Sequence, residues 1–221
     1  MEYLVEGISE VVEKDLELIE SLLTIKDKVR EEAIRVSREI TRLSTEAIRL
    51  VHLRKFNEAG KLLNEASAAV KSLLEKLSDH PDLMYCGLIY GCLAEYVEAR
   101  MLFDLTYKRK LTGLQELGVP YIPYLQGLGD VVGELRRLAI DLIKAGSFNE
   151  ANLYIDVMEE IYQRLKKLSF PDALTPGLRH KVDVARRLIE DTKTLFINAY
   201  NASKLMEKLD LKSGYSKSNN V

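Results

Sequence analysis

Apolar residues recur every three or four positions along almost the whole chain, which is the spacing that places side chains on one face of an α-helix. We find no segment with the strict alternation typical of a β-strand, and Gly and Pro stand mainly between the periodic segments. We therefore predict an all-α protein. The first expected helices cover approximately residues 3–53, with a possible break near Thr24, and residues 56–77 and 82–111. Residues 113–123 form a connection, and the helix that follows it ends near residue 146. The last two expected helices cover residues 149–168 and 177–209.

The 221 residues are enough for one hydrophobic core, and 47% of them are hydrophobic. We predict a single helical domain over residues 1–209 and a mobile C-terminal tail over residues 210–221, where small and polar residues replace the apolar pattern. No stretch approaches the roughly 18 uninterrupted apolar residues of a membrane span. The first six residues lack the basic region and apolar core of a secretory signal, so we expect a cytoplasmic protein with no membrane partner.

Two acidic pairs lie inside the most apolar predicted helices. Glu95 and Glu98 belong to the helix 82–111, and Asp130 and Glu134 belong to the next one. Residues three or four apart share one face of a helix, so each pair projects to one side. We call these four residues the acidic cluster. If the two helices pack together, four carboxylates converge, and such oxygen ligands suit Mg²⁺ or Mn²⁺ and the phosphoryl-transfer or hydrolysis chemistry that these ions assist.

Ion pairing within the protein is the main alternative for the acidic cluster. The chain contains 34 acidic residues, so acidic pairs at helical spacing are common in it. Arg100, Arg136 and Arg137 stand close to the four acids in sequence and could neutralise them. The residues alone leave both interpretations open.

A row of cations occupies one face of the first predicted helix. Lys28, Arg35, Arg42 and Arg49 recur every seven residues, and Arg38 joins them; these five residues form what we call the basic row. At 1.5 Å per residue the row is roughly 31 Å long, which is enough to follow several phosphates of a nucleic acid. The alternative is a solvated face in which these cations pair with neighbouring glutamates. The net charge of −2 argues against a uniformly basic nucleic-acid binder.

Histidine and cysteine residues give no support to other chemistries. His52, His80 and His180 are scattered, with no Ser or Cys nucleophile placed beside any of them by a motif, so a catalytic triad is not indicated. Cys86 and Cys92 lie six residues apart in an apolar segment without a histidine cluster. We expect free thiols rather than a disulfide or a zinc site.

Several motifs together resemble the translin family. Residues 124–135 follow the pattern Tyr-Leu-x-Gly-x-x-Asp-x-x-Gly-Glu-Leu, and residues 95–99 read Glu-Tyr-Val-Glu-Ala. Further agreement lies around the basic row and His52 and in residues 177–192, so that the resemblance spans most of residues 26–208. Because plain translin subunits lack the full acidic set, the chain resembles more specifically the catalytic branch of that family, translin-associated factor X.

The resemblance implies an all-α fold of about seven helices that assembles into a hollow, roughly octameric shell, encloses RNA and cuts it with a divalent ion. Eukaryotic members of the catalytic branch carry a long insertion between the acidic helices and work beside translin. The corresponding connection here, residues 113–123, is short. We therefore expect a homo-oligomer, with an octamer as the expected size.

Three functions are compatible with these observations. The leading hypothesis is a Mg²⁺- or Mn²⁺-dependent endoribonuclease acting on single-stranded RNA, in which the acidic cluster supplies both the catalytic residues and the metal ligands and the basic row binds the nucleic acid. The second is a non-catalytic, translin-like protein that binds single-stranded DNA or RNA. The third is a structural helical adaptor without affinity for RNA.

Overall fold

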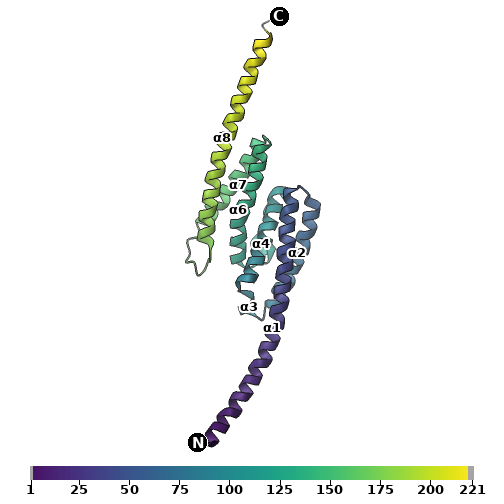
Figure 1. Ribbon diagram of the computed structural model, residues 1–221, viewed down its shortest axis with the longest axis vertical. Coiled ribbons are helices and arrows are strands. Elements are labelled where there is room, and N and C mark those ends of the chain that lie inside the picture. The colour runs from purple at the N-terminus through teal and green to yellow at the C-terminus, as the bar shows by residue number, and fades with distance from the viewer. Residues whose placement is uncertain (1, 219–221) are drawn as a thin grey trace.

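The computed structural model describes residues 2–218, and its elements are helical from end to end (Figure 1). Within those residues there is no strand, as predicted for an all-α protein. The elements are α1 (Glu2–His52), α2 (Phe56–Leu77), α3 (Pro81–Met84), α4 (Gly87–Phe103), the π-helix η1 (Asp104–Lys108), α5 (Leu114–Leu117), α6 (Tyr121–Lys144), α7 (Phe148–Lys166) and α8 (Leu178–Ser218).

The long helices pack in two groups that meet along α4 and α6. Helices α1, α2 and α4 contact one another on one side, while α6, α7 and α8 contact one another on the other. Side chains from each of five helices are fully buried in the shared core, among them Ile40, Leu63, Leu93, Leu135 and Met158. The N-terminal part of α1 and the C-terminal part of α8 extend beyond the bundle at opposite ends of the molecule (Figure 1).

The helix predicted for residues 82–111 is interrupted twice. At its start, Cys86 has an extended backbone (φ −80°, ψ 154°) between α3 and Gly87, the first residue of α4. At its end, α4 passes into η1, which stops where Arg109 adopts a left-handed conformation (φ 57°). The fully buried Asp104 explains this second change, because its carboxylate accepts hydrogen bonds from the amide and hydroxyl of Thr112 and so requires the chain to turn back.

The two longest helices also differ from the predicted boundaries. Helix α1 is unbroken at Thr24, whose hydroxyl donates a hydrogen bond of 2.8 Å to the carbonyl of Glu20 within the helix. Helix α8 continues to Ser218, past the predicted end at about residue 209. The mobility expected for the tail stays a prediction, and residues 219–221 lie outside the described part of the chain. No helix in that part is long and apolar enough to cross a membrane.

Candidate active site

A close approach between α4 and α6 places the acidic cluster. A β-carbon added to Gly127 of α6 would lie 2.6 Å from the carbonyl oxygen of Ala94 and 2.7 Å from Cβ of Val97, closer than real side chains come. Only a glycine therefore permits this contact. Asp130 lies one helical turn from Gly127, and Glu98 directly follows Val97, so the acids of both helices adjoin the contact.

The four acids lie on helices α4 and α6, which pack together, while their convergence around one metal ion stays a prediction. All four side chains are partly buried. Burial, together with the negative charges of Asp130, Glu134 and Glu95, raises the pKa of Glu98 to about 8, while Lys181 acts in the opposite direction. The charge of Glu98 is therefore influenced by acids of both helices.

Two of the acids have basic partners from distant helices. Nζ of Lys181, on α8, donates a hydrogen bond of 2.5 Å to Asp130. The ring of His52, at the end of α1, makes a short hydrogen bond through Nε2 to Glu134. This bond is the main reason that the pKa of Glu134 is lowered. The site is therefore assembled by four helices: α1, α4, α6 and α8.

The arginines considered as alternative partners mostly lie elsewhere. Nε of Arg100 is 3.3 Å from the buried carboxylate of Asp104. Nη1 of Arg137 is 3.9 Å from Glu134, and Nε of Arg136 is buried without a hydrogen-bond partner among the described residues. Part of the cluster is thus ion-paired, but mainly with bases other than those expected from nearness in sequence.

Lys181 and His52 were not singled out from the sequence as site residues. Both nevertheless fall in segments that carry the family resemblance, namely residues 177–192 and the end of the first predicted helix. Their position in these two segments was the only feature of the sequence that pointed to them. Side-chain periodicity could not reveal them, because it does not show which helices are neighbours.

The donor chemistry of the cluster fits a hard divalent cation. Four carboxylates without a cysteine are the type of ligand that Mg²⁺ and Mn²⁺ prefer. Glu98 and Glu95 have no ion pair within 4.0 Å among the described side chains. Among the side chains that the structure describes, however, no three His, Cys, Asp or Glu are gathered closely enough to hold a metal ion as they stand. Binding would require the carboxylates to close around the ion.

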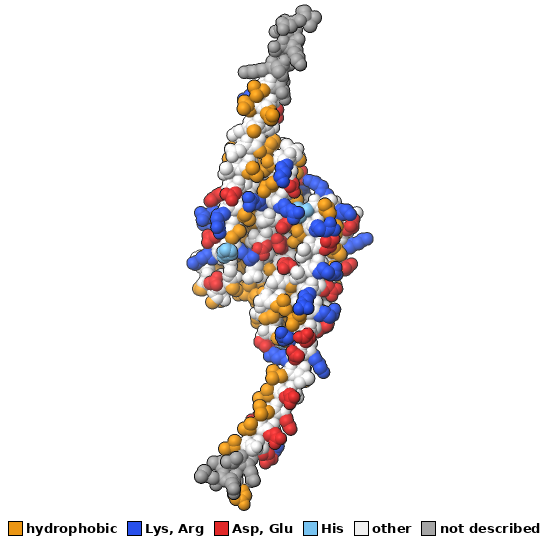
Figure 2. Space-filling model, in the orientation of Figure 1, with side chains coloured by type: hydrophobic (Ala, Val, Ile, Leu, Met, Phe, Trp, Pro, Cys, Tyr) orange, Lys and Arg blue, Asp and Glu red, His pale blue; other side chains and the backbone are white. Residues whose placement is uncertain are grey.

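One face of the molecule carries acidic side chains near its middle and basic side chains beside them (Figure 2). Figure 2 shows acidic side chains gathered in the middle of the molecule, with Lys and Arg side chains on both flanks. An acidic centre between basic margins is suited to a phosphodiester backbone that crosses it, since the margins attract the phosphates.

The basic row contains two kinds of cation. All five side chains are exposed. Arg35 forms two hydrogen bonds of 2.9 Å with Glu32, and Arg49 forms bonds of 2.7 and 2.6 Å with Glu46, as the solvated-face alternative requires. In the described structure no partner within 4.0 Å neutralises the other three members, which are Lys28, Arg38 and Arg42.

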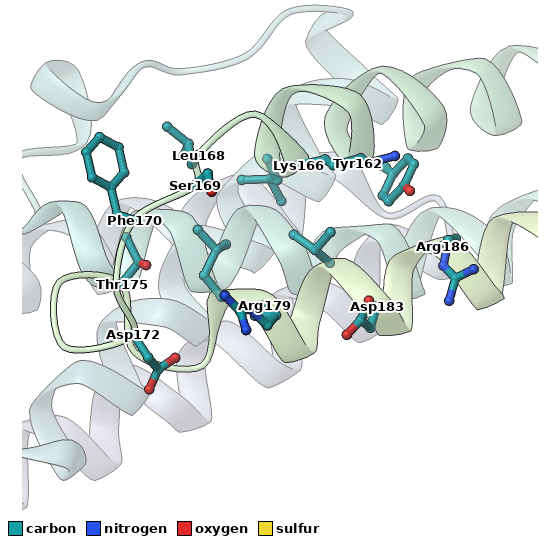
Figure 3. Close-up of a pocket in the computed structure, with 13 residues that line it drawn as sticks. Tyr162, Lys166, Leu168, Ser169, Phe170, Asp172, Thr175, Arg179, Asp183 and Arg186 are labelled. Atoms are coloured by element: carbon teal, nitrogen blue, oxygen red, sulfur yellow. The ribbon is translucent and has the colours of Figure 1, made fainter.

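A separate pocket of about 370 Å³ lies between the end of α7 and the start of α8 (Figure 3). Arg179 and Arg186 of α8 line it together with Lys166 of α7, and Asp172 and Asp183 add opposite charge. No member of the acidic cluster lines this pocket, so it is not part of the candidate active site.

Comparisons with known proteins agree over most of the chain. The family model described as "Translin family" matches residues 28–192. An uncharacterized protein of Methanocaldococcus jannaschii is 32% identical over 197 residues, which are 88% of this chain and 87% of that protein.

Solved structures share the same helical arrangement. The AfC3PO–duplex RNA complex has a TM-score of 0.79 and 36% identity, and the match covers 85% of this chain and 97% of the other. The crystal structure of AfC3PO matches with a TM-score of 0.78, 36% identity and the same coverage. Apo-NeC3PO, with a TM-score of 0.76 and 23% identity over 83% of this chain and 96% of its own, shows likeness of fold alone.

Proposed function

Because this chain belongs to the translin family, we propose that it is an RNA-binding protein and a divalent-metal-dependent endoribonuclease whose active site is the acidic cluster. In this proposal it stands nearer to the catalytic branch of the family than to plain translin. It works as a homo-oligomeric shell, with an octamer as the expected assembly.

The position of Glu98 is the main support. This carboxyl is partly buried, and its pKa is raised to about 8 by burial and by three neighbouring acids. Groups with strongly shifted pKa values are concentrated at functional sites. Acids held together without a neutralising positive charge lower the stability of the fold, so such a cluster is kept where function requires it. A divalent cation would supply that positive charge.

Each side chain of the site has a distinct proposed part. Glu95, Glu98, Asp130 and Glu134 would hold Mg²⁺ or Mn²⁺, which when bound neutralises phosphate charge and lowers the pKa of a water molecule. Lys181 and His52 orient the carboxylates of Asp130 and Glu134 through their hydrogen bonds. Near neutral pH Glu98 keeps its proton while no cation is present, so cation binding should release a proton.

RNA is the proposed substrate, and the basic row is its proposed contact. Lys28, Arg38 and Arg42 are the members best placed to bind phosphates, because no glutamate holds them. The sequence favours single-stranded RNA, whereas the related AfC3PO structure contains duplex RNA. Both strand types, and single-stranded DNA, therefore belong in the test.

A non-catalytic nucleic-acid-binding protein is the second candidate. It is favoured by the hydrogen bonds that Lys181 and His52 already make to Asp130 and Glu134, and by the lack of three gathered metal donors in the described residues. In that case the acids have a structural role, and nucleic acid binds without being cut.

The two candidates differ in a cleavage experiment. End-labelled single-stranded and duplex RNA, with single-stranded DNA beside them, are incubated with purified protein in Mg²⁺, Mn²⁺ or a chelator, and binding is measured on the same samples. The endoribonuclease predicts internal cuts in RNA that require the metal. Binding without cuts under every condition supports the carrier, and no binding even at low salt contradicts both.

A further inference from the structure

A pocket of about 280 Å³ adjoins the acidic cluster, where the ends of α1 and η1 meet α6 and α7. His52 lines this pocket and also makes the short hydrogen bond to Glu134, so its ring connects the pocket with the candidate active site. Asp141, another lining residue, follows Glu134 by seven positions on α6. At 1.5 Å per residue the pocket therefore extends to roughly 10 Å from Glu134 along this helix.

Two arginines with an unusual backbone conformation line the pocket. Arg54 follows α1 and Arg109 follows η1, and their φ angles are 58° and 57°. Among the described residues, no other residue except glycine has a positive φ. Glycine is the usual choice where a helix ends in this conformation, because a side chain is strained there. Two strained arginines at one pocket indicate that their side chains, rather than the turns, are what function requires.

The pocket contains a positive charge that the protein does not neutralise. Its two acids already have basic partners, since Glu150 lies 3.3 Å from Arg109 and Asp141 lies 3.4 Å from Lys144. In the described part of the chain, no carboxylate lies within 4.0 Å of the guanidinium group of Arg54. Arg109 gives one N–H group to Glu150 and has others to offer. The pocket is therefore suited to an anion.

His52 supplies an independent indication of a ligand. Its side chain is only 7% exposed, and its Nδ1 atom is buried without a hydrogen-bond partner among the described residues. Buried polar atoms are normally paired, so an orphaned one points to a partner that enters from outside the chain. Because Nε2 faces the carboxylate of Glu134, Nδ1 of the neutral ring requires a donor, such as a ribose hydroxyl or an ordered water molecule.

We propose that this pocket binds a backbone phosphate of the RNA substrate, with Arg54 as the principal contact and Arg109 as the second. The proposal rests on the proposed function and names where the strand lies beside the acidic cluster. Guanidinium groups suit this task because their planar N–H groups match the oxygens of a phosphate. Roughly 10 Å corresponds to about three nucleotide steps of a stacked strand, so the phosphate held here is a few nucleotides from the one that is cut.

A glycine substitution separates RNA binding from folding. Arg54→Gly removes the guanidinium group and also relieves the strained backbone, so this variant should melt at the wild-type temperature or above it. Its affinity for RNA, measured in chelator, should fall about tenfold or more. The slope of log affinity against log salt concentration should become shallower by about 0.7–0.9, as expected for one lost phosphate contact.

Two further variants serve as controls for this measurement. Arg54→Lys keeps the positive charge and should keep the salt slope of the wild type. Lys71→Gln removes an exposed cation of α2 that does not line the pocket, and it should bind RNA as the wild type does. Wild-type affinity and salt slope in Arg54→Gly would overturn the proposal.

A scan of the RNA identifies the bound group. A neutral methylphosphonate replaces the phosphate at one linkage after another of a short RNA. The wild type should lose about tenfold in affinity at one linkage near the cut, and Arg54→Gly should be insensitive to that same change. If inorganic phosphate raises the melting temperature of the wild type but no linkage depends on Arg54, the pocket serves a free anion and the proposal is wrong.

These measurements do not require cutting, so they are distinguishable from a test of the nuclease. A wild type that binds no RNA at low salt defeats the proposed function and the phosphate contact together. A wild type that binds RNA with no dependence on Arg54 defeats the phosphate contact alone.

Discussion

Replacing Glu98 by Gln should make the metal-free protein more stable at alkaline pH. The amide keeps the size and hydrogen-bonding shape of the side chain but cannot ionise. In the wild type the pKa rises from 4.5 to about 8 on folding, which at about 1.4 kcal/mol per pH unit corresponds to about 5 kcal/mol. Because water reaches the partly exposed carboxyl, we expect about 2–4 kcal/mol of this to be measured.

The direction of the pH dependence follows from proton binding. Between pH 4.5 and about 8 the folded wild type holds a proton at Glu98 that the unfolded chain has lost, so its stability falls as pH rises. The Gln variant lacks this loss. We expect the two proteins to be equally stable near pH 4.5 and the variant to melt about 4–16 °C higher at pH 8.5.

The assay is thermal and urea unfolding of both proteins in chelator across this pH range, at one fixed protein concentration. Glu65→Gln is the matched control, because Glu65 is an exposed helical glutamate on α2. It should show no pH-dependent gain. A stability difference between wild type and Glu98→Gln that is the same at every pH would refute the reasoning.

Three further predictions concern the packing and charges of the site. Gly127→Ala should cost about 2 kcal/mol or more in urea unfolding because its β-carbon meets α4, whereas Gly133→Ala, with open space around it, should be neutral or stabilising by up to about 1 kcal/mol. His52→Phe should destabilise by about 1–3 kcal/mol at pH 6, and this difference should shrink as pH falls below 4.5 because the lowered pKa of Glu134 no longer contributes. In filter binding, Arg38→Ala should lower the affinity for RNA more than Arg35→Ala does, and it should also reduce the salt dependence of binding. Equal losses of affinity in the two variants would contradict the phosphate contact assigned to the unpaired cations.

The sequence predicted the helical elements well because helical periodicity is a local property. It missed the interruption at Cys86 and the π-helix after Phe103, since the latter depends on Asp104 reaching Thr112 across a turn. Neither depends on the three-to-four spacing of apolar residues, which continues through both positions.

Four of the six residues of the candidate site were singled out from the sequence, and the two bases were not. Acids three and four apart had to share a helix face, and the apolar surroundings of Glu98 indicated burial. The bases were not predictable in this way, because His52 is 82 residues from Glu134 and Lys181 is 51 residues from Asp130. Such contacts are set by which helices pack together, and periodicity does not encode that.

The most direct test of the central claim is the rate at which Glu98→Gln cuts end-labelled RNA in Mn²⁺, relative to wild type and Glu65→Gln and normalised to the amount of RNA bound. The proposed active site predicts a loss of about 100-fold or more in Glu98→Gln, with RNA binding and folding retained and Glu65→Gln fully active. Cleavage by Glu98→Gln at the wild-type rate would contradict the assignment of the acidic cluster as the active site.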